Sequence, residues 1–269
     1  MEMAIHNAGG FVENPGIIRG AVYTTGGANT KGAYTALIAS TGYDCDGLYL
    51  SFMANAIANK LLVDVAIGGA GAEVIILSNF LVNNAVTFGN QIYIPIEVPA
   101  GSRIAVRAQS NTASAQSYVV CHLVRGGLWK SPGGGTVETL GDVTGTSRGT
   151  TIDPGTSLST WGAWIQLSAA TVKDIVALWP QISIISNAAM VSSPFGMAFQ
   201  VGVGAAAAEQ IALGPLTFSS ITTFMSGWPQ MWLPCQIPQG SRISARGYTL
   251  DTVDATDRLY DLCLYGLNN

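Results

Sequence analysis

The sequence predicts an all-β protein made of two tandem β-sandwich domains, jelly-roll-like in kind, that arose by an internal duplication. The first observation is that the stretch 95–107 returns as residues 234–246, with the same order of proline, glycine, serine and arginine. In each copy a Pro-x-Gly-Ser turn precedes a strand with alternating faces, since successive strand side chains point to opposite sides. The second is that short strand-forming runs, separated by Gly, Asn and Ser, recur along both halves, as in β-sandwiches.

Further matches extend the repeat over most of the chain. Arg19-Gly20 corresponds to Arg148-Gly149, and Glu73 corresponds to Glu209. We therefore expect an N-terminal arm (1–18), a first sandwich (19–127), a Gly-rich linker (128–147) and a second sandwich (148–269). Because each copy carries its own apolar strands, we expect the two halves to fold as separate domains.

The strands of the first copy are predicted from runs of apolar and β-branched residues. No stretch has sustained helical periodicity, and only residues 54–62 and 205–213 are ambiguous. The expected strands are 34–39, 48–53, 61–67, 73–79, 91–98, 102–108 and 117–123.

Composition excludes several classes of function. Only 10% of the residues are charged and the net charge is −4, so nucleic-acid binding is not expected. The first residues lack the features of a secretion signal. Residues 175–208 carry no charge, but Pro180, Gln181 and Pro194 interrupt them, so we expect no membrane insertion.

The four cysteines are expected to be free thiols. Cys121 and Cys263 fall in matching motifs of separate copies, and Cys45 and Cys235 align with isoleucines, as small core residues do. Free buried thiols suit synthesis in a reducing compartment.

The aromatic residues divide into two groups when the copies are aligned. Where a large ring recurs, the position is expected to lie in a core; these pairs are Tyr34 with Trp164, Tyr49 with Trp179 and Tyr93 with Trp232. In contrast, Trp161 and Trp228 align with Lys31 and Gly89. Such tryptophans are expected near the surface, as binding residues or as local packing.

No catalytic residue, metal site or cofactor is predicted. His122 follows Cys121 directly, so in a strand the two side chains point apart and cannot act as base and nucleophile. Residues 202–204 carry a Gly-x-Gly pattern, but the expected context is a hairpin rather than a phosphate-binding loop before a helix. Asp251, Asp254 and Asp257 share one loop, which is either a cation site or, with more support, a solvated acidic loop.

Two predictions concern the sparse charges. Arg103 and Arg107 share a strand face, as do Arg242 and Arg246, and we expect one arginine of each pair to meet Glu73 or Glu209 across the sheet. Between residues 174 and 242 the only charged residue is Glu209. A surface with so little charge suits burial, so we expect a homo-oligomer in which the second copy supplies most of the interface, anchored by Trp228.

The stretches 67–76 and 96–105 resemble segments of virion proteins of tailed bacteriophages. The resemblance implies a non-enzymatic virion structural protein, either a head decoration or cement protein or a tail, baseplate or fibre component. Its partners would be itself and other virion proteins, and its location the virion after synthesis in the host cytoplasm. The alternative is a receptor- or glycan-binding module of the particle, with Trp161 and Trp228 stacking on a host surface glycan.

Overall fold

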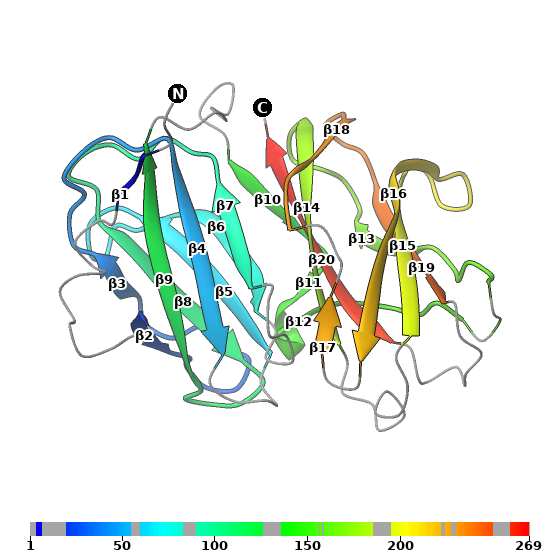
Figure 1. The fold of residues 1–269 in the computed structure, drawn as a ribbon, viewed down its shortest axis with the longest axis horizontal. Helices are drawn as coiled ribbons and strands as arrows, with labels where there is room; N and C mark the ends of the chain where they lie inside the picture. Colours follow the sequence, from blue (N-terminus) through cyan, green and yellow to red (C-terminus); the bar gives the residue numbers. More distant parts are fainter. Residues whose placement is uncertain are drawn as a thin grey trace.

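The chain forms two β-sandwiches that lie side by side in the computed structural model (Figure 1). The structure describes residues 4–6, 20–54, 60–82, 90–125, 136–155, 157, 159–184, 195–221, 224–226, 230–249 and 259–268. Within these ranges the only helical element is a single 3-10 turn, η2 (Thr144–Thr146). The predicted all-β class with two sandwiches is therefore confirmed.

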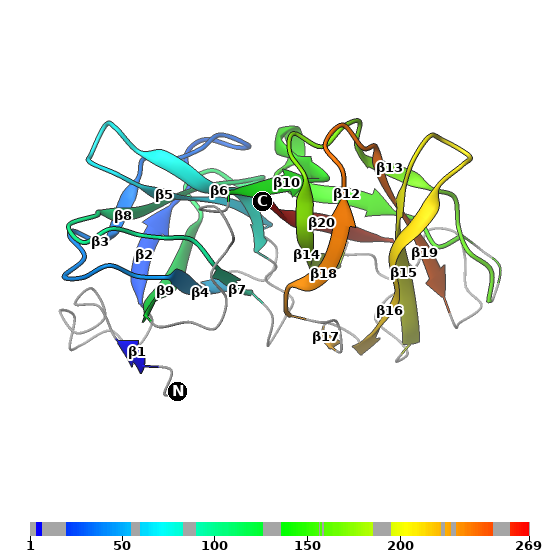
Figure 2. The ribbon, with the colours of Figure 1, turned by 90° about the horizontal axis from the view of Figure 1, so that it is seen from above.

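The first sandwich consists of two antiparallel sheets, seen as two layers in Figure 2. One sheet has the order β1-β9-β4-β7 with β2 also paired to β9, and the other has the order β3-β8-β5-β6. Two sheets of orders β2-β9-β4-β7 and β3-β8-β5-β6 form a jelly roll. The strands are β1 (Ala4–His6), β2 (Ala21–Thr24), β3 (Thr35–Ile38), β4 (Gly47–Ala54), β5 (Leu61–Ile67), β6 (Val74–Val82), β7 (Gln91–Ile94), β8 (Ile104–Ser110) and β9 (Gln116–Arg125).

The second sandwich repeats this topology. One sheet has the order β11-β12-β20-β14-β18 with β10 also paired to β20, and the other has the order β13-β19-β15-β16-β17. The first comprises β10 (Val137–Leu140), β11 (Asp142–Val143), β12 (Arg148–Ile152), β14 (Ile175–Ile184), β18 (Leu233–Ile237) and β20 (Tyr260–Asn268). The second comprises β13 (Ile165–Ser168), β15 (Phe195–Val203), β16 (Gln210–Ile221), β17 (Phe224–Ser226) and β19 (Ile243–Thr249).

All seven strands predicted for the first copy are present, but the expected arm and linker also contain strands. Strand β1, inside the predicted arm, pairs with the end of β9, and β10, inside the predicted linker, pairs with the end of β20. Residues 137–147 thus belong to the second sandwich, while residues 128–135 lie outside the described part of the chain. Strands β1 and β10 therefore occupy matching positions in the two sandwiches.

The register of the last strand differs by one residue from the sequence match. Tyr49 lies opposite His122 in the first sandwich, whereas its counterpart Trp179 lies opposite Tyr265. Cys121 consequently points into its own sandwich, and Cys263 points out of the other, because a one-residue shift reverses the face of a strand. The two thiols do not occupy equivalent positions.

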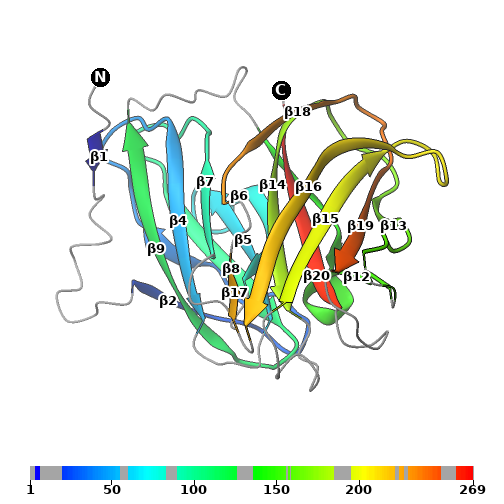
Figure 3. The ribbon, with the colours of Figure 1, turned by 45° about the vertical axis from the view of Figure 1, so that its right-hand side comes forward.

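Each sandwich has an apolar core of its own, and the core of the first copy extends across the junction to residues of the second. Strands β14 and β20 lie between the first sandwich and the β15–β16 layer (Figure 1), and in Figure 3 that layer crosses in front of them. Their outward residues are buried against the first copy, and the apolar core of the first copy includes Ala177, Trp179, Trp232, Cys263, Tyr265 and Leu267 from the second. This packing also explains part of the uncharged span, because outward positions such as Trp179 and Gln181 face protein rather than water.

Polar contacts reinforce the junction. The Tyr265 hydroxyl accepts a hydrogen bond from Leu81 N–H (2.7 Å) and donates one to the Asn79 carbonyl (3.1 Å). Trp232 Nε1 donates to the Tyr93 carbonyl at 2.6 Å. Lys60 forms an ion pair with Asp261, whose side chain is fully buried. The junction therefore combines apolar burial with satisfied polar groups.

Candidate ligand-binding site on the second sandwich

Both copies place an arginine–glutamate pair on the outer face of the β8 or β19 sheet. Arg103 Nη1 lies 2.8 Å from Glu73 Oε1, and Arg242 Nη1 lies 2.8 Å from Glu209 Oε1. Each glutamate immediately precedes the second strand of the β5–β6 or β15–β16 hairpin, so the pair bridges the sheet. The hydrogen bond from Arg242 lowers the pKa of Glu209. The predicted pairing across the sheet is confirmed in both copies.

The second arginine of the first copy belongs to an ionic cluster. Asp64, which is almost fully buried, accepts hydrogen bonds from Arg107 Nε at 2.9 Å and Lys31 Nζ at 2.7 Å. The backbone N–H of Asn79 donates to the same carboxylate at 3.0 Å, and the guanidinium carbon of Arg107 lies 4.6 Å from the centre of the Tyr34 ring. Two cations thus neutralise the Asp64 carboxylate, and all three side chains belong to the first copy.

The second copy replaces this ionic cluster with an aromatic one. Arg246 donates from Nε and Nη2 to a neutral acceptor, Gln200 Oε1, at 3.0 and 2.8 Å. Its guanidinium carbon lies 4.4 Å from the ring centre of Trp164 and 5.0 Å from that of Trp161, distances typical of cation–π contacts. The Trp161 ring in turn lies 5.0 Å from the ring of Tyr248.

Local backbone geometry positions these four side chains, which we call the Arg246 cluster (Trp161, Trp164, Arg246 and Tyr248). Arg246 and Tyr248 alternate with buried residues along β19, so both point outward. A backbone bridge pairs Trp161 with Tyr248, which extends the β13 edge of the sheet. The cluster therefore rests on paired backbone rather than on a free loop.

Glycine at position 202 makes room for Trp164. A Cβ atom at Gly202 would lie 2.8 Å from the indole Cζ3, closer than real Cβ atoms approach. The first copy has Ala66 at the position that matches Gly202, and the smaller ring of Tyr34 at the position that matches Trp164. The change from Tyr to Trp and the change from Ala to Gly are therefore physically coupled, and this coupling was the sequence signal that could have revealed the cluster.

The structure places only some of the singled-out aromatic residues where the sequence analysis expected them. Trp161 lies half-buried on the outer face, as expected for a residue near the surface. Trp164 and Tyr34 were expected in a core, but both are half-buried on the outer face, where they contact the arginines. Trp228 and the loop with Asp251, Asp254 and Asp257 lie outside the described residues. Trp179 and Trp232 are buried at 3% and 5% exposure, as predicted for core positions.

The described residues offer little for metal or nucleophilic chemistry. They contain no group of three or more His, Cys, Asp or Glu side chains that could hold a metal ion. His122 lies on the outer face beside Tyr49, whereas the adjacent Cys121 is buried inside the sandwich, where burial raises the pKa of its thiol to about 12. Across the described ranges no helix is long and apolar enough to cross a membrane.

Comparison with known proteins gives only remote structural likenesses. No family model matches the chain, and no curated protein sequence matches it. A solved structure of PNGF-II is similar over 93% of this chain, at a TM-score of 0.38 and 6% identity, and the chain spans 65% of that protein's length.

Two other solved structures are similar at 10% identity each. The tandem CBM22 domains of Paenibacillus barcinonensis Xyn10C match with a TM-score of 0.26, covering 99% of this chain and 97% of that one. A structure of infectious bursal disease virus, Gx strain, matches with a TM-score of 0.22, covering 86% and 58%. With TM-scores below 0.5, none of these proteins lends its function to this chain.

Proposed function

We propose that the protein is a non-enzymatic structural subunit of a bacteriophage virion that works by assembling with copies of itself and with other virion proteins. It would serve as a head decoration or cement protein, or as a tail, baseplate or fibre component, after synthesis in the host cytoplasm. The resemblance of residues 67–76 and 96–105 to phage virion proteins supports this identity. One structural observation supports the assembly role, namely exposed apolar side chains on the outer face of the first sandwich.

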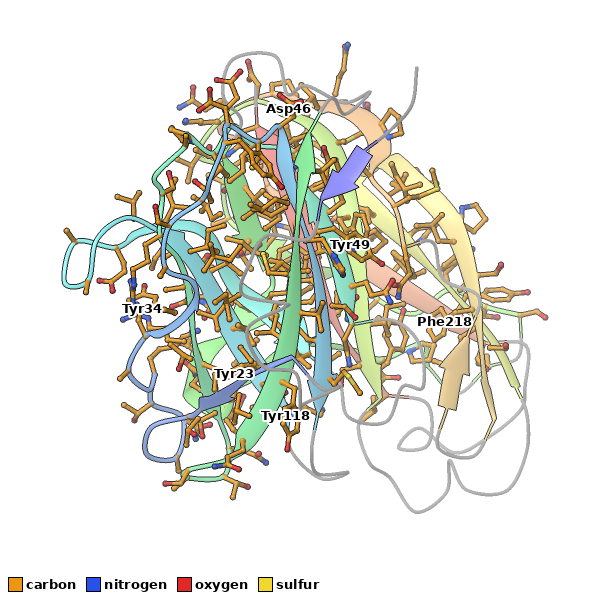
Figure 4. The ribbon with its side chains drawn as sticks, turned by 60° about the vertical axis from the view of Figure 1, so that its left-hand side comes forward. Tyr23, Tyr34, Asp46, Tyr49, Tyr118 and Phe218 are labelled. Carbon is orange, nitrogen blue, oxygen red and sulfur yellow. The ribbon has the colours of Figure 1, made fainter. Side chains whose placement is uncertain are left out.

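This outer face, the β2-β9-β4 face, carries an apolar row across three strands. Val22 and Met53 both lie opposite Tyr118, and they are 38% and 49% exposed. The next part of the face carries the Tyr49 and His122 rings, 6.1 Å apart. Tyr118 and Tyr49 are labelled along these strands in Figure 4. Apolar side chains grouped on an exposed sheet face favour an interaction site.

The proposed occupant of the β2-β9-β4 face is a second copy of this chain. The equivalent face of the second sandwich, formed by β12, β20 and β14, is already buried against a sandwich of the same fold. The duplicated fold thus uses this sheet face for docking once within the chain, and contact between chains would use it a second time. The internal contact already occupies the outer face of the second copy, so we place the interface between chains on the first copy.

The test is light scattering of the purified full-length chain at micromolar concentration. We expect an oligomer, and we expect Met53→Arg to dissociate it, because a charge in a desolvated patch is costly. Ile211→Arg is the matched control, since Ile211 is 53% exposed on a hairpin of the other sandwich. A monomeric wild-type chain that also fails to sediment with virions lacking it would overturn the proposal.

A further inference from the structure

We propose that the Arg246 cluster is a binding site for a carboxylated saccharide, such as a glycan that contains uronic or sialic acid. The cluster lies on the β13-β19-β15-β16 sheet, away from the β2-β9-β4 face, so this inference does not depend on the assembly proposal. It gives the glycan-binding alternative a definite site and a definite ligand chemistry.

The charge of Arg246 supports an anionic ligand. In the first copy Asp64 neutralises Arg107, but the matching residue in the second copy is the neutral Gln200. Nε and Nη2 of Arg246 both donate to Gln200 Oε1, and Nη1 donates to no other described residue. A guanidinium has five N–H donors, so the edge formed by Nη1 and Nη2 keeps the paired geometry that binds a carboxylate with two hydrogen bonds.

The aromatic rings support a sugar as the carrier of that carboxylate. The second copy has Trp161 where the first has Lys31, and Trp164 where the first has Tyr34, so two indole rings flank the Arg246 guanidinium. Aromatic rings present wide, rigid apolar area, and binding sites combine such area with a few placed polar groups. The C–H face of a pyranose can pack on an indole while its carboxylate meets Arg246. The Arg246 cluster holds a single arginine and the net charge of the chain is −4, so the site is poorly suited to a polyanion.

Access differs between the two copies at this position. In the first copy Gln109, which matches Tyr248, donates from Nε2 to the Thr144 carbonyl at 2.6 Å and to Ser147 Oγ at 3.1 Å. A segment of the second sandwich therefore covers the first copy beside its ionic cluster. In the second copy Trp161 and Tyr248 stay half-buried, and no described residue of the first sandwich bonds to them. Among the described residues, the other sandwich contacts this surface only in the first copy.

The test uses the full-length chain with two pairs of saccharides that differ in charge. Titration calorimetry and tryptophan fluorescence would measure binding of galacturonic acid against its methyl ester, and of 3′-sialyllactose against lactose. We expect at least one acid to bind, with its neutral partner at least about tenfold weaker, the usual effect of losing a charged hydrogen-bond pair. Failure of both acids to bind at millimolar concentration, or equal binding of acid and neutral forms, overturns the proposal.

Variants locate the binding on the chain. Arg246→Gln and Trp161→Ala should each weaken binding of the acid by about tenfold or more. Arg107→Gln, at the matching position of the first copy, should leave binding unchanged. Circular dichroism confirms that each variant is folded before binding is measured. Equal affinity of wild type and both site variants, or an equal loss in Arg107→Gln, would exclude the Arg246 cluster as the site.

Discussion

Replacing Tyr265 with phenylalanine tests how much the junction between the two sandwiches contributes to stability. The Tyr265 side chain is fully buried between the copies, and its hydroxyl bonds to the N–H of Leu81 and the carbonyl of Asn79. Phenylalanine keeps the ring but leaves a buried N–H without an acceptor, which costs about 1–3 kcal/mol. For a chain of this size each kcal/mol lowers Tm by roughly 2–4 °C.

Tyr260→Phe is the matched control on the same strand. Tyr260 is also fully buried, but it points into its own sandwich and its hydroxyl has no hydrogen-bond partner among the described residues. Its removal should leave the free energy of unfolding unchanged or slightly higher, because no bond is lost. If the two variants destabilise the protein equally, the Tyr265 bonds contribute nothing specific to the junction.

The same experiment tests cooperativity, using urea unfolding followed by two signals. All six tryptophans lie at or after position 129, so their fluorescence reports mainly on the second copy, whereas far-UV circular dichroism reports on both. A junction that couples the two sandwiches predicts coincident transitions. Two separate transitions in the wild-type chain would refute that coupling.

Two further predictions follow from individual side chains. Burial raises the pKa of Cys121 to about 12 and that of Cys235 to about 11. A thiol reagent at pH 8 should therefore label the native protein very slowly, and should label all four cysteines once the protein is unfolded. Rapid labelling of the native chain would contradict the packing. Arg242 lowers the pKa of Glu209, so their interaction stabilises the fold above the usual pKa of 4.5 and is lost as pH falls through the lowered value. Arg242→Gln should therefore reduce Tm at pH 7 and have a smaller effect at pH 3. A double-mutant cycle with Glu209→Gln that shows no coupling would rule the interaction out.

The strands and the arginine–glutamate pairs were predictable because their signals are local. Alternation in β8 and β19 placed the arginines on one face, and the repeat then indicated a common partner for them. Strands β1 and β10 were missed because they are short and lie in stretches rich in glycine and loop-forming residues. Their strand conformation depends on pairing with β9 and β20, which are distant in sequence.

The junction between the copies was not predictable from either copy alone. Trp179 and Tyr265 are outward residues of a sheet, and nothing local distinguishes an outward residue that meets water from one that meets another sandwich. The matched Tyr-x-x-Cys motifs also suggested a register that is one residue out, because four similar letters are weak evidence against the pairing of a whole strand.

The Arg246 cluster shows how the duplication allowed the two copies to diverge. A buried aspartate such as Asp64 requires compensating cations, so Lys31 and Arg107 are tied to structural roles in the first copy. Exchange of that carboxylate for the Gln200 amide removes the requirement for the lysine, and a tryptophan can then occupy its position without leaving a buried charge unpaired. Gln200 and the rings hold the arginine, and no carboxylate of the described residues pairs with its remaining edge. A structural ion cluster and a surface suited to an acidic ligand are thus separated by a few coupled substitutions. The change from Asp64 to Gln200 matters as much as the two tryptophans, because it removes the carboxylate that would neutralise the arginine.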